Sequence, residues 1–407
     1  MKAVRVSMRG TQHSMGGHSI AADGFVLDMK KMSKMSFDHQ TGLVTCGPGC
    51  TWSDLIRYLN NFGMSPHTMQ SYSSFSVGGT IAVNGHGITT DECLVESVRA
   101  LRLVKWDGTV LVCSREATGE GRELFGLAIG GYGLFGVITE VTMVVSRNCH
   151  LTMERVRLNI EEFAACYAHV QSAKVGLKLA RLNILEPDNI ELFVFRKAHS
   201  SDVGTISVLG RQPKGLSWQK QLMYKWVMPN AQELRYKFEQ WTGTRVDWSG
   251  ALERNTMMYI SAEPVAKLYE PLVRLDDTFV LQEFFVPREK IQAWIEDAKP
   301  IYKELAVHRQ LQLLNTTIRF VRQDLETVLN YAASPEGMFA FVLYYRMPRT
   351  QSADLELQRF HTWFVQVSLK HGGTFYLPYR HHYTAEELTR AYPRIGEFFK
   401  SKEKHDP

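Results

Sequence analysis

The run RGTQHSMGGHS, residues 9–19, places three glycines, two histidines and three hydroxyl side chains in one short segment. Glycine lets a backbone come close to a ligand, and small side chains leave N–H groups free to contact an anion such as a pyrophosphate. An imidazole in such a loop can also act as a nucleophile. These residue types predict a phosphate-binding loop. A surface turn that contains two histidines by chance is the alternative.

The elements beside this segment are predicted to be strands. Val4 and Val6 alternate with polar residues before it, and residues 25–28, FVLD, follow it. Alternation with a period of two is typical of strands. The segment is therefore expected to be a loop between two strands.

A second glycine-rich segment covers residues 76–87, with the sequence SVGGTIAVNGHG. A wide, flat ring system and its phosphates can lie against a backbone only where side chains are missing. The segment is therefore predicted to be a second ligand loop. An ordinary tight bend with a hydrogen-bonded histidine remains the alternative.

A third group, Gly131, Gly133 and Gly136, satisfies the pattern G-x-G-x-x-G. In a Rossmann fold this pattern follows a strand and opens a helix. Here it follows a predicted helix at 123–128 and opens a predicted strand at 137–145. The Rossmann interpretation is therefore rejected.

Together the three segments resemble the FAD-contacting loops of the vanillyl-alcohol-oxidase family of flavoproteins, which carry a PCMH-type FAD-binding domain. The matching phrases are Arg-Gly-x-x-His-Ser, Val-Gly-Gly with Asn-x-His-Gly, and Gly-Gly-x-Gly-x-Phe-Gly-Val-Ile, in that order. The resemblance implies that FAD is the cofactor. It assigns these cofactor-binding residues: Arg9, Gly10, Thr11, Gln12, His13, Ser14, Met15, Gly16, Ser76, Val77, Gly78, Gly79, Asn84, Gly85, His86, Gly87, Gly131, Gly133, Gly136, Val137 and Ile138.

Several members of that family attach FAD covalently through the histidine of the first loop. The spacing from Arg9 and Gly10 matches this position to His13 rather than His18. Other members use the loop without a covalent bond, so both forms of attachment stay open. A second linkage through a cysteine is not expected, because residues 72–76 contain none.

The length of 407 residues favours two domains. The expected fold is α+β: a PCMH-type, two-subdomain FAD-binding domain at residues 1–147 and a cap domain with an antiparallel sheet and helices at 148–380. Residues 381–407 are expected to return toward the FAD-binding domain. Compared with the family, both ends look shortened, and a strand–helix unit before the first loop is expected to be missing.

The coarse pattern also predicts particular elements. A strand at 42–46 precedes a helix capped by Thr51 or Ser53, with Leu55, Ile56, Leu59 and Phe62 on one apolar face. The predicted cap strands are 279–287, 316–321, 339–345 and 374–380. Residues 197–248 are the hardest to assign; Trp218, Trp226 and Trp241 are expected there as core residues.

The cap resembles that of sugar-alcohol and aldonolactone oxidases, and the first domain is also similar to that of cytokinin dehydrogenase-like flavoproteins. In the former enzymes a Glu-x-Arg pair faces the flavin; here Arg319 is kept and Thr317 replaces the acid. Tyr379 and Arg380 stand in the phrase that supplies a lysine there. We therefore expect Arg319, Tyr379 and Arg380 as catalytic residues. Other polar candidates on the cap strands are Gln282, Tyr345, His381 and His382.

The resemblance implies hydride transfer from a small alcohol, sugar, lactone or amine to FAD, with oxygen or another acceptor taking the electrons afterwards. The substrate also loses a proton, so a neutral imidazole or a phenolate is expected as the base. The alternative is a shortened, catalytically silent relative that binds FAD weakly or not at all.

Composition argues against several other classes of protein. The net charge of +5 is not concentrated in a polybasic block, so nucleic-acid binding is not expected. No apolar run of membrane-spanning length and no signal peptide is visible, which favours the cytoplasm. Six cysteines predict reduced thiols rather than a disulfide framework. Cys46 and Cys50 lack a second close pair to complete a metal site, so no metal is expected.

Overall fold

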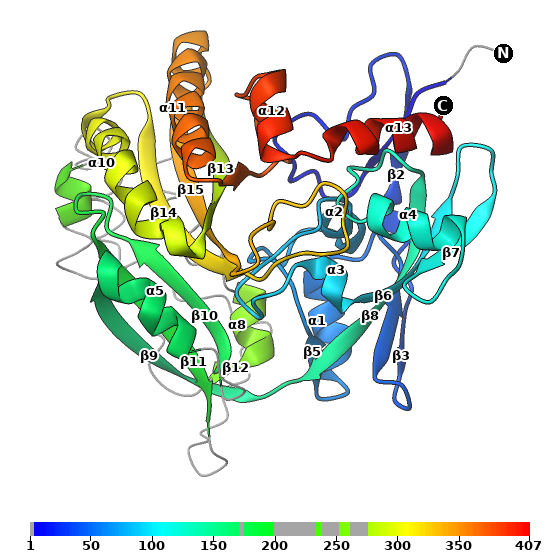
Figure 1. Cartoon of the computed structure of the whole chain (residues 1–407). Helices are drawn as coiled ribbons and strands as arrows, with labels where there is room; N and C mark the ends of the chain where they lie inside the picture. Colours follow the sequence, from blue (N-terminus) through cyan, green and yellow to red (C-terminus); the bar gives the residue numbers. More distant parts are fainter. Residues whose placement is uncertain (1–3, 171–174, 199–232, 238–251, 261–275) are drawn as a thin grey trace.

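The structure is a computed structural model that describes residues 4–170, 175–198, 233–237, 252–260 and 276–407. Figure 1 shows two sheet-containing halves beside each other, with helices on the outer side of one of them. The first half contains β1 (Val6–Arg9), β2 (Phe25–Asp28), β3 (Met35–Asp38), β4 (Leu43–Cys46), α1 (Trp52–Asn60), β5 (Met64–Pro66), α2 (Val77–Ala82), α3 (Leu94–Ser97), β6 (Val98–Val104), β7 (Val110–Ser114), α4 (Glu120–Ala128) and β8 (Val137–Arg147).

The second half follows along the chain and ends in two helices. Its elements are β9 (His150–Asn159), α5 (Ile160–His169), β10 (Val175–Leu182), β11 (Asn189–Lys197), β12 (Leu252–Glu253), α8 (Arg254–Ile260), β13 (Asp277–Pro287), α10 (Ile291–Val307), β14 (Gln312–Val321), β15 (Met338–Pro348), α11 (Gln351–Lys370), β16 (Thr374–Phe375), α12 (Ala385–Ala391) and α13 (Ile395–His405).

The sheet of the first half has the strand order β3-β4-β8-β6-β7, and β5 pairs separately with β8. The predicted strand at 42–46 and the helix after it are both present. Thr51 caps α1 in a capping box with Asp54, which explains why the helix begins there. The prediction that Phe62 continues the apolar face of this helix is wrong, because α1 ends at Asn60 and Phe62 is exposed beyond it.

The sheet of the second half, here called the cap sheet, is antiparallel throughout, with the order β12-β9-β11-β10-β14-β15-β13-β16. One of its faces is covered by α5, α10 and α11 (Figure 1). Phe284 of β13 stacks on Phe364 of α11, and Phe341 of β15 lies 4.3 Å from the Trp294 ring of α10. The α+β class expected from the sequence is confirmed.

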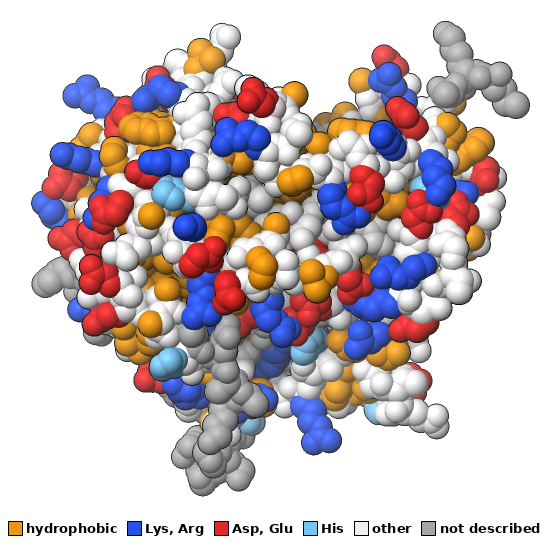
Figure 2. Space-filling view, in the orientation of Figure 1, with side chains coloured by type: hydrophobic (Ala, Val, Ile, Leu, Met, Phe, Trp, Pro, Cys, Tyr) orange, Lys and Arg blue, Asp and Glu red, His pale blue; other side chains and the backbone are white. Residues whose placement is uncertain are grey.

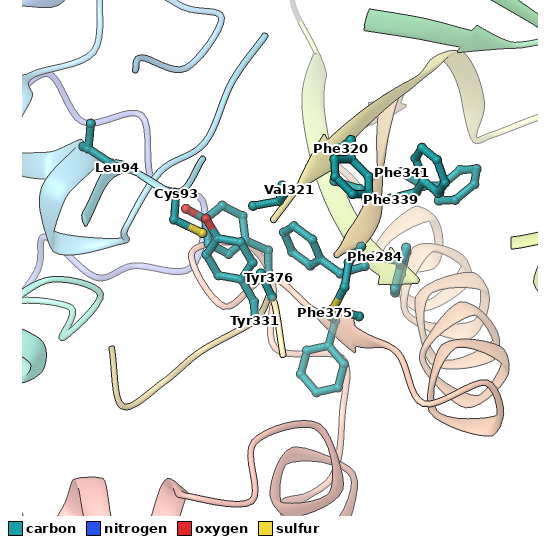
Figure 3. Packing of buried hydrophobic residues seen from close by; sticks show 14 of the residues in the cluster. Cys93, Leu94, Phe284, Phe320, Val321, Tyr331, Phe339, Phe341, Phe375 and Tyr376 are labelled. Atoms are coloured by element: carbon teal, nitrogen blue, oxygen red, sulfur yellow. The ribbon is translucent and has the colours of Figure 1, made fainter. Parts of the chain in front are cut away.

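Aromatic side chains fill the contact between the two halves. Figure 3 shows Cys93 of the first half close to Tyr331 and Tyr376 of the second. The phenol of Tyr331 donates a hydrogen bond to the Asn84 carbonyl oxygen, at 2.6 Å. Since these side chains are almost fully buried, the two sheets share one continuous core.

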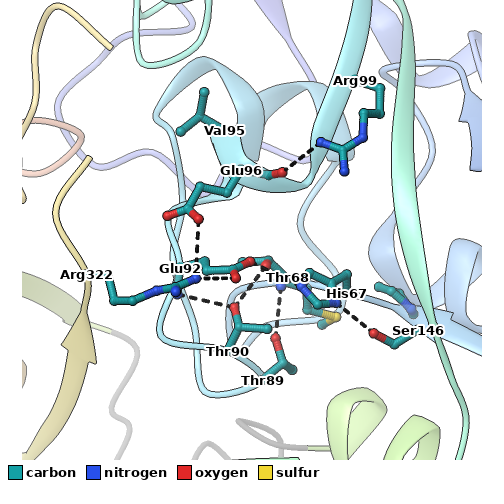
Figure 4. A network of polar contacts seen from close by, with 12 residues as sticks. His67, Thr68, Thr89, Thr90, Glu92, Val95, Glu96, Arg99, Ser146 and Arg322 are labelled. Atoms are coloured by element: carbon teal, nitrogen blue, oxygen red, sulfur yellow. Dashed lines mark hydrogen bonds and ion pairs between the residues drawn. The ribbon is translucent and has the colours of Figure 1, made fainter. Parts of the chain in front are cut away.

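A polar network also joins the halves near the end of β14. Arg322 forms ion pairs with Glu92 and Glu96, and the Nε2 atom of His67 lies 3.1 Å from Glu92 (Figure 4). Next to this network, the ammonium group of Lys178 on β10 lies 2.6 Å from the Asp91 carboxylate. These contacts fix β10 and β14 relative to the first half.

Two predictions about regular structure need correction. The last cap strand was expected to cover 374–380, but β16 contains only Thr374 and Phe375. Pro378 cannot donate to a ladder, and its carbonyl oxygen accepts instead from the N–H group of Met15, at 3.2 Å. The second glycine segment was expected to be a loop, but its first part is the short helix α2.

The C-terminal helix α13 lies on α4 of the first half. Lys404 forms an ion pair with Glu123, and the Nδ1 atom of His405 lies 3.0 Å from Glu120. Among the described residues, no helix has both the length and the apolar composition needed to cross a bilayer. Trp218, Trp226 and Trp241 lie outside the described residues.

Candidate active site

The structure brings the three glycine segments together. The N–H group of Ser76, which precedes α2, donates to the hydroxyl of Thr11 in the first segment, at 3.1 Å. The N–H group of Tyr132 in the third segment donates to the carbonyl oxygen of Ala82 at the end of α2, at 2.8 Å. A Cβ atom at Gly133 would lie 2.7 Å from the Met8 methyl group. The short helix α2 therefore lies between the first and third segments.

Two glycines lie against the side chain of Ser76. A Cβ atom at Gly10 would lie 2.0 Å from the Ser76 Oγ atom, and one at Gly79 would lie 2.9 Å from the same atom. Gly79 is exposed, and Ser76 Oγ is the nearest atom that its side chain would meet. Gly10 is therefore packed against Ser76, whereas a single hydroxyl group restricts Gly79, whose backbone is open to a ligand.

Other predicted cofactor glycines are needed for packing inside the protein. A Cβ atom at Gly131 would lie 1.9 Å from the Leu127 carbonyl oxygen, and one at Gly87 would lie 1.7 Å from the Met69 carbonyl oxygen. A Cβ atom at Gly78 would lie 2.5 Å from the Pro48 Cβ atom, and one at Gly136 would lie 2.5 Å from the Val104 carbonyl oxygen. At these positions the missing side chain makes room for another part of the chain.

Val137 and Ile138 begin strand β8, where they pair with Val104 and Leu103. Ile138 is buried in the core. Asn84 has a positive φ of 48° and is held inside the protein. Its side chain donates to Asp324 and accepts from the N–H group of Val95, each at 2.9 Å. The structure therefore gives Asn84 a role in connecting the two halves.

His13 lies at the edge of the first segment. Its ring stacks on Phe75, with ring centroids 4.2 Å apart, and its Nε2 atom lies 3.2 Å from the Ser74 hydroxyl. Burial of the ring lowers the pKa of His13 below its ordinary value. The neutral imidazole, which is the nucleophilic form, is therefore favoured.

His18 has a different environment. Its ring lies between Tyr132 and His381, and its Nδ1 atom is buried with no hydrogen-bond partner in the described part of the chain. Burial and the nearby charge of His381 lower the pKa of His18. A Cβ atom at Gly16 would meet this ring and the Tyr379 carbonyl oxygen. His18 thus packs the first segment against residues that follow β16.

A histidine and a carboxylate meet where the halves join. The Nε2 atom of His86 lies 2.6 Å from the Oε1 atom of Glu283 on β13, and each side chain is 2% exposed. The phenol of Tyr379 donates to the other oxygen of Glu283, at 3.4 Å. Burial and the charge of Glu283 raise the pKa of Tyr379 well above its ordinary value. Tyr379 is therefore a neutral hydrogen-bond donor in this cluster.

Arg319 lies on β14 close to the same cluster. Its guanidinium group donates to the Ser71 hydroxyl, at 2.7 Å, while its Nε atom is buried without a hydrogen-bond partner in the part of the chain that the structure describes. Its positive charge lowers the pKa of both Tyr72 and Tyr379, although burial raises each of these pKa values by more. Arg319 and Tyr379, predicted separately, are thus brought together.

The remaining polar candidates point elsewhere. Arg380 forms an ion pair with Asp354 of α11, and His382 lies with its Nδ1 atom 2.8 Å from that of His361 on the same helix. Tyr345 packs against His361 as well. By register Gln282 shares the helix-covered face of the cap sheet with Phe284.

The sequence analysis missed Glu283, Ser71 and Tyr72. Glu283 had a visible signal, since it is the only ionisable residue between Thr278 and Pro287 in an otherwise apolar strand. Such a carboxylate is rarely buried unless it has a partner. Ser71 and Tyr72 lie in a polar segment without a recognisable motif, so nothing in the sequence distinguished them.

The residues present fit a bound FAD. Gly79 leaves an open backbone beside Ser76, as a phosphate group requires. The Nε atoms of Arg9 and Arg319 and the Oε1 atom of Gln70 are buried without hydrogen-bond partners among the described residues. Unpaired buried polar atoms are unfavourable, so these groups are suited to a polar ligand. No group of three or more metal-binding side chains occurs in the described ranges.

Comparison with known proteins agrees with this geometry. Residues 2–114 match a family described as an FAD binding domain. Cytokinin dehydrogenase 2 of Arabidopsis thaliana is 29% identical over 143 residues, which cover 35% of this chain and 28% of that protein. The "uncharacterized oxidoreductase ORF5 in fasciation locus" of Rhodococcoides fascians is 32% identical over 140 residues, with 34% and 31% covered. These alignments span less than a third of either relative.

L-gulonolactone oxidase of Mus musculus is 23% identical over 421 residues, which cover 96% of this chain and 85% of that protein. Residues 2–114 are thus an FAD-binding domain. The resemblance expected from the glycine motifs is confirmed: residues 2–114 match an FAD binding domain, and the chain is similar to cytokinin dehydrogenases and to L-gulonolactone oxidase.

Proposed function

We propose that this protein is an FAD-dependent oxidoreductase that removes a hydride from a small alcohol, sugar or lactone. The observation that carries the proposal is the arrangement of the loops and the polar cluster. Three glycine segments meet at the two ends of α2, and the group of His86, Glu283 and Tyr379 joins this domain to the cap sheet. The predicted domain limits at residues 147 and 380 form part of this proposal.

FAD, when bound, supplies the hydride acceptor. The side chains of the protein hold the donor and accept its proton. His86 is placed for the second task, because Glu283, 2.6 Å away, would stabilise the protonated imidazole. Tyr379 donates to the same carboxylate and keeps its orientation fixed. Arg319 is available to bind an oxygen of the donor.

The comparisons support an alcohol-type donor over an amine. Similarity to cytokinin dehydrogenase 2 covers only 35% of the chain, whereas similarity to L-gulonolactone oxidase covers 96% and therefore includes the cap sheet. Because the cap supplies Glu283, Arg319 and Tyr379, its similarity bears on the choice of donor. Oxygen or another acceptor then takes the electrons from the cofactor.

Titration with FAD tests the first step of this proposal. The purified chain should bind close to one FAD per molecule and become yellow, and bound FAD should lose fluorescence when it lies against aromatic side chains. A colourless protein that cannot be loaded with FAD would support the alternative, a catalytically silent relative.

A further inference from the structure

We propose that the donor carries a carboxylate group and that Arg319 binds this group on the face of the cap sheet turned toward the FAD-binding domain. This inference rests on the proposed function and specifies its substrate class. The donor would therefore be a small hydroxylated acid. Arg319 would bind its carboxylate, and the carbon to be oxidised would lie in another part of the molecule.

The first argument is the unbalanced charge of Arg319. Ser71 provides a neutral hydroxyl for the guanidinium group, and the Nε atom is buried without a partner among the residues that the structure describes. Within the same residues Arg319 forms no ion pair. Arg319 as a whole is half-buried, and a partly desolvated cation is stabilised when an anion and hydrogen-bond acceptors accompany it. The site is therefore suited to an anionic ligand.

The second argument is that the neighbouring groups do not supply that anion. Glu283 is the carboxylate of the cluster, and its Oε1 atom is already 2.6 Å from His86. Burial raises the pKa of Tyr72, and burial together with Glu283 raises that of Tyr379, so both phenols stay neutral. They can donate hydrogen bonds to the hydroxyl or carboxylate oxygens of a ligand.

The register of the cap sheet gives the third argument. Thr317 is opposite Arg181 on β10 and Val342 on β15, and Val342 is opposite Glu283, so these residues share the face that bears Arg319. Arg181 adds a second positive charge to that face. Phe279 and Tyr344, which stack with ring centroids 5.1 Å apart, add apolar surface.

A carboxylate is the anion that best matches a single arginine. The planar guanidinium group can form two parallel hydrogen bonds with the two oxygens, which fixes the orientation of the ligand as well as its affinity. A fixed carboxylate at one end would leave the hydroxyl-bearing carbon in one position relative to His86. Arg319 would thereby select the donor and the carbon that reacts.

Gluconate and sorbitol form a suitable pair of probes, because they share a hydroxylated six-carbon chain and differ in the carboxylate. Binding to the FAD-loaded chain is measured by calorimetry and by the shift in Tm, so that turnover is not required. Gluconate should bind about tenfold or more tightly than sorbitol, since a hydrogen-bonded ion pair contributes at least that factor. Arg319→Met should remove the difference, and Arg319→Lys should keep part of it.

Two further variants test the charge rather than the shape of the site. Thr317→Glu places a carboxylate on the same face as Arg319 and should abolish the preference for gluconate. Thr317→Gln has nearly the same size without the charge and should retain the preference. Arg196→Met removes an exposed arginine already paired with Glu154 and should leave both affinities unchanged.

Each outcome separates this inference from the proposed function. Equal affinity for the two probes in a chain that binds FAD would overturn the carboxylate assignment and leave the function intact. Arg319→Met that alters the reduction potential of bound FAD, with the gluconate preference unchanged, would assign Arg319 to the cofactor instead. A chain that cannot bind FAD would refute the proposed function itself.

Discussion

The Nε2 atom of His86 lies 2.6 Å from the Oε1 atom of Glu283, and the two side chains are almost completely buried. His86 belongs to the second glycine segment and Glu283 to β13, so the contact joins the FAD-binding domain to the cap sheet. The chain thereby keeps a proton acceptor and a carboxylate in one fixed position. In the proposed reaction this pair takes the proton that the donor loses.

Glu283→Gln should lower kcat by about 10²- to 10⁴-fold, because an amide cannot stabilise a protonated imidazole. The amide oxygen can still accept from Tyr379, so the fold and the FAD content should be retained. Steady-state kinetics with the best donor, together with Tm, measures the effect. Glu154→Gln is the control, because that exposed glutamate pairs with Arg196 on the cap sheet. Equal kcat in the two variants would remove Glu283 from the mechanism.

His13→Ala should abolish retention of flavin by acid-precipitated protein, whereas His18→Ala should not. The neutral ring of His13 lies in the first segment against Phe75, as attachment to the flavin ring would require, and His18 packs between Tyr132 and His381. The colour of the washed precipitate is the measurement. Release of free FAD from the unmodified protein by acid would show that attachment is non-covalent.

Gly79→Val and Gly131→Val should fail in different ways. At Gly79 the added side chain meets only the Ser76 hydroxyl and the space left for a ligand, so FAD affinity should fall at least about tenfold with little change in Tm. At Gly131 the side chain collides with the Leu127 carbonyl oxygen, so Tm itself should fall by several degrees. Gly396→Val, in open space on α13, is the control. Unchanged FAD affinity in Gly79→Val would argue against the loop assignment.

The pair of His361 and His382 should make stability depend on pH. Burial lowers the pKa of His382 to about 4 and lowers that of His361 well below its ordinary value. Between about pH 6.5 and 4 the unfolded chain therefore binds protons that the folded chain excludes, and the free energy of unfolding falls as pH is lowered. Below about pH 4 the contribution of His382 becomes constant, because both states are then protonated.

Urea unfolding of the protein and of His382→Asn at several pH values measures this effect. The variant should lose less stability between pH 6.5 and 4, since it no longer carries the excluded proton. A parallel decline in both proteins would mean that carboxylates, such as Glu120 and Glu123 beside α13, account for the acid sensitivity.

The N-terminal elements were predictable because local chemistry determines them. Thr51, one of the two expected caps, does begin α1, where it forms a capping box with Asp54. The order of the three glycine segments predicted the resemblance to FAD-binding flavoproteins, which the comparisons confirm.

The polar cluster was less predictable because it depends on contacts between distant segments. Glu283 and His86 are almost 200 residues apart, and only the folded chain brings them together. Arg380 follows Tyr379 directly in the sequence. Because β16 ends at Phe375, the two residues do not share a strand, and Arg380 forms an ion pair with Asp354 instead. Gly131 belongs to one of the family motifs, but a side chain at this position would also collide with the Leu127 carbonyl oxygen. Packing against the chain and contact with a ligand are distinguished only in the folded structure.

Figure 2 shows acidic and basic side chains interspersed on the visible face, in keeping with the modest net charge of +5. On that face no large surface of one charge competes with the buried cluster as a binding site. In the proposed function a small donor lies between the halves. The charge of Arg319 then becomes the main electrostatic feature that such a donor meets.

The absorption spectrum of the FAD-loaded chain under anaerobic conditions tests the central claim most directly. Addition of a hydroxylated acid, sugar or lactone should bleach the visible absorption band of the oxidised flavin. An added electron acceptor should restore the band. Retention of the full band with every donor of these three kinds would contradict the proposed oxidoreductase activity.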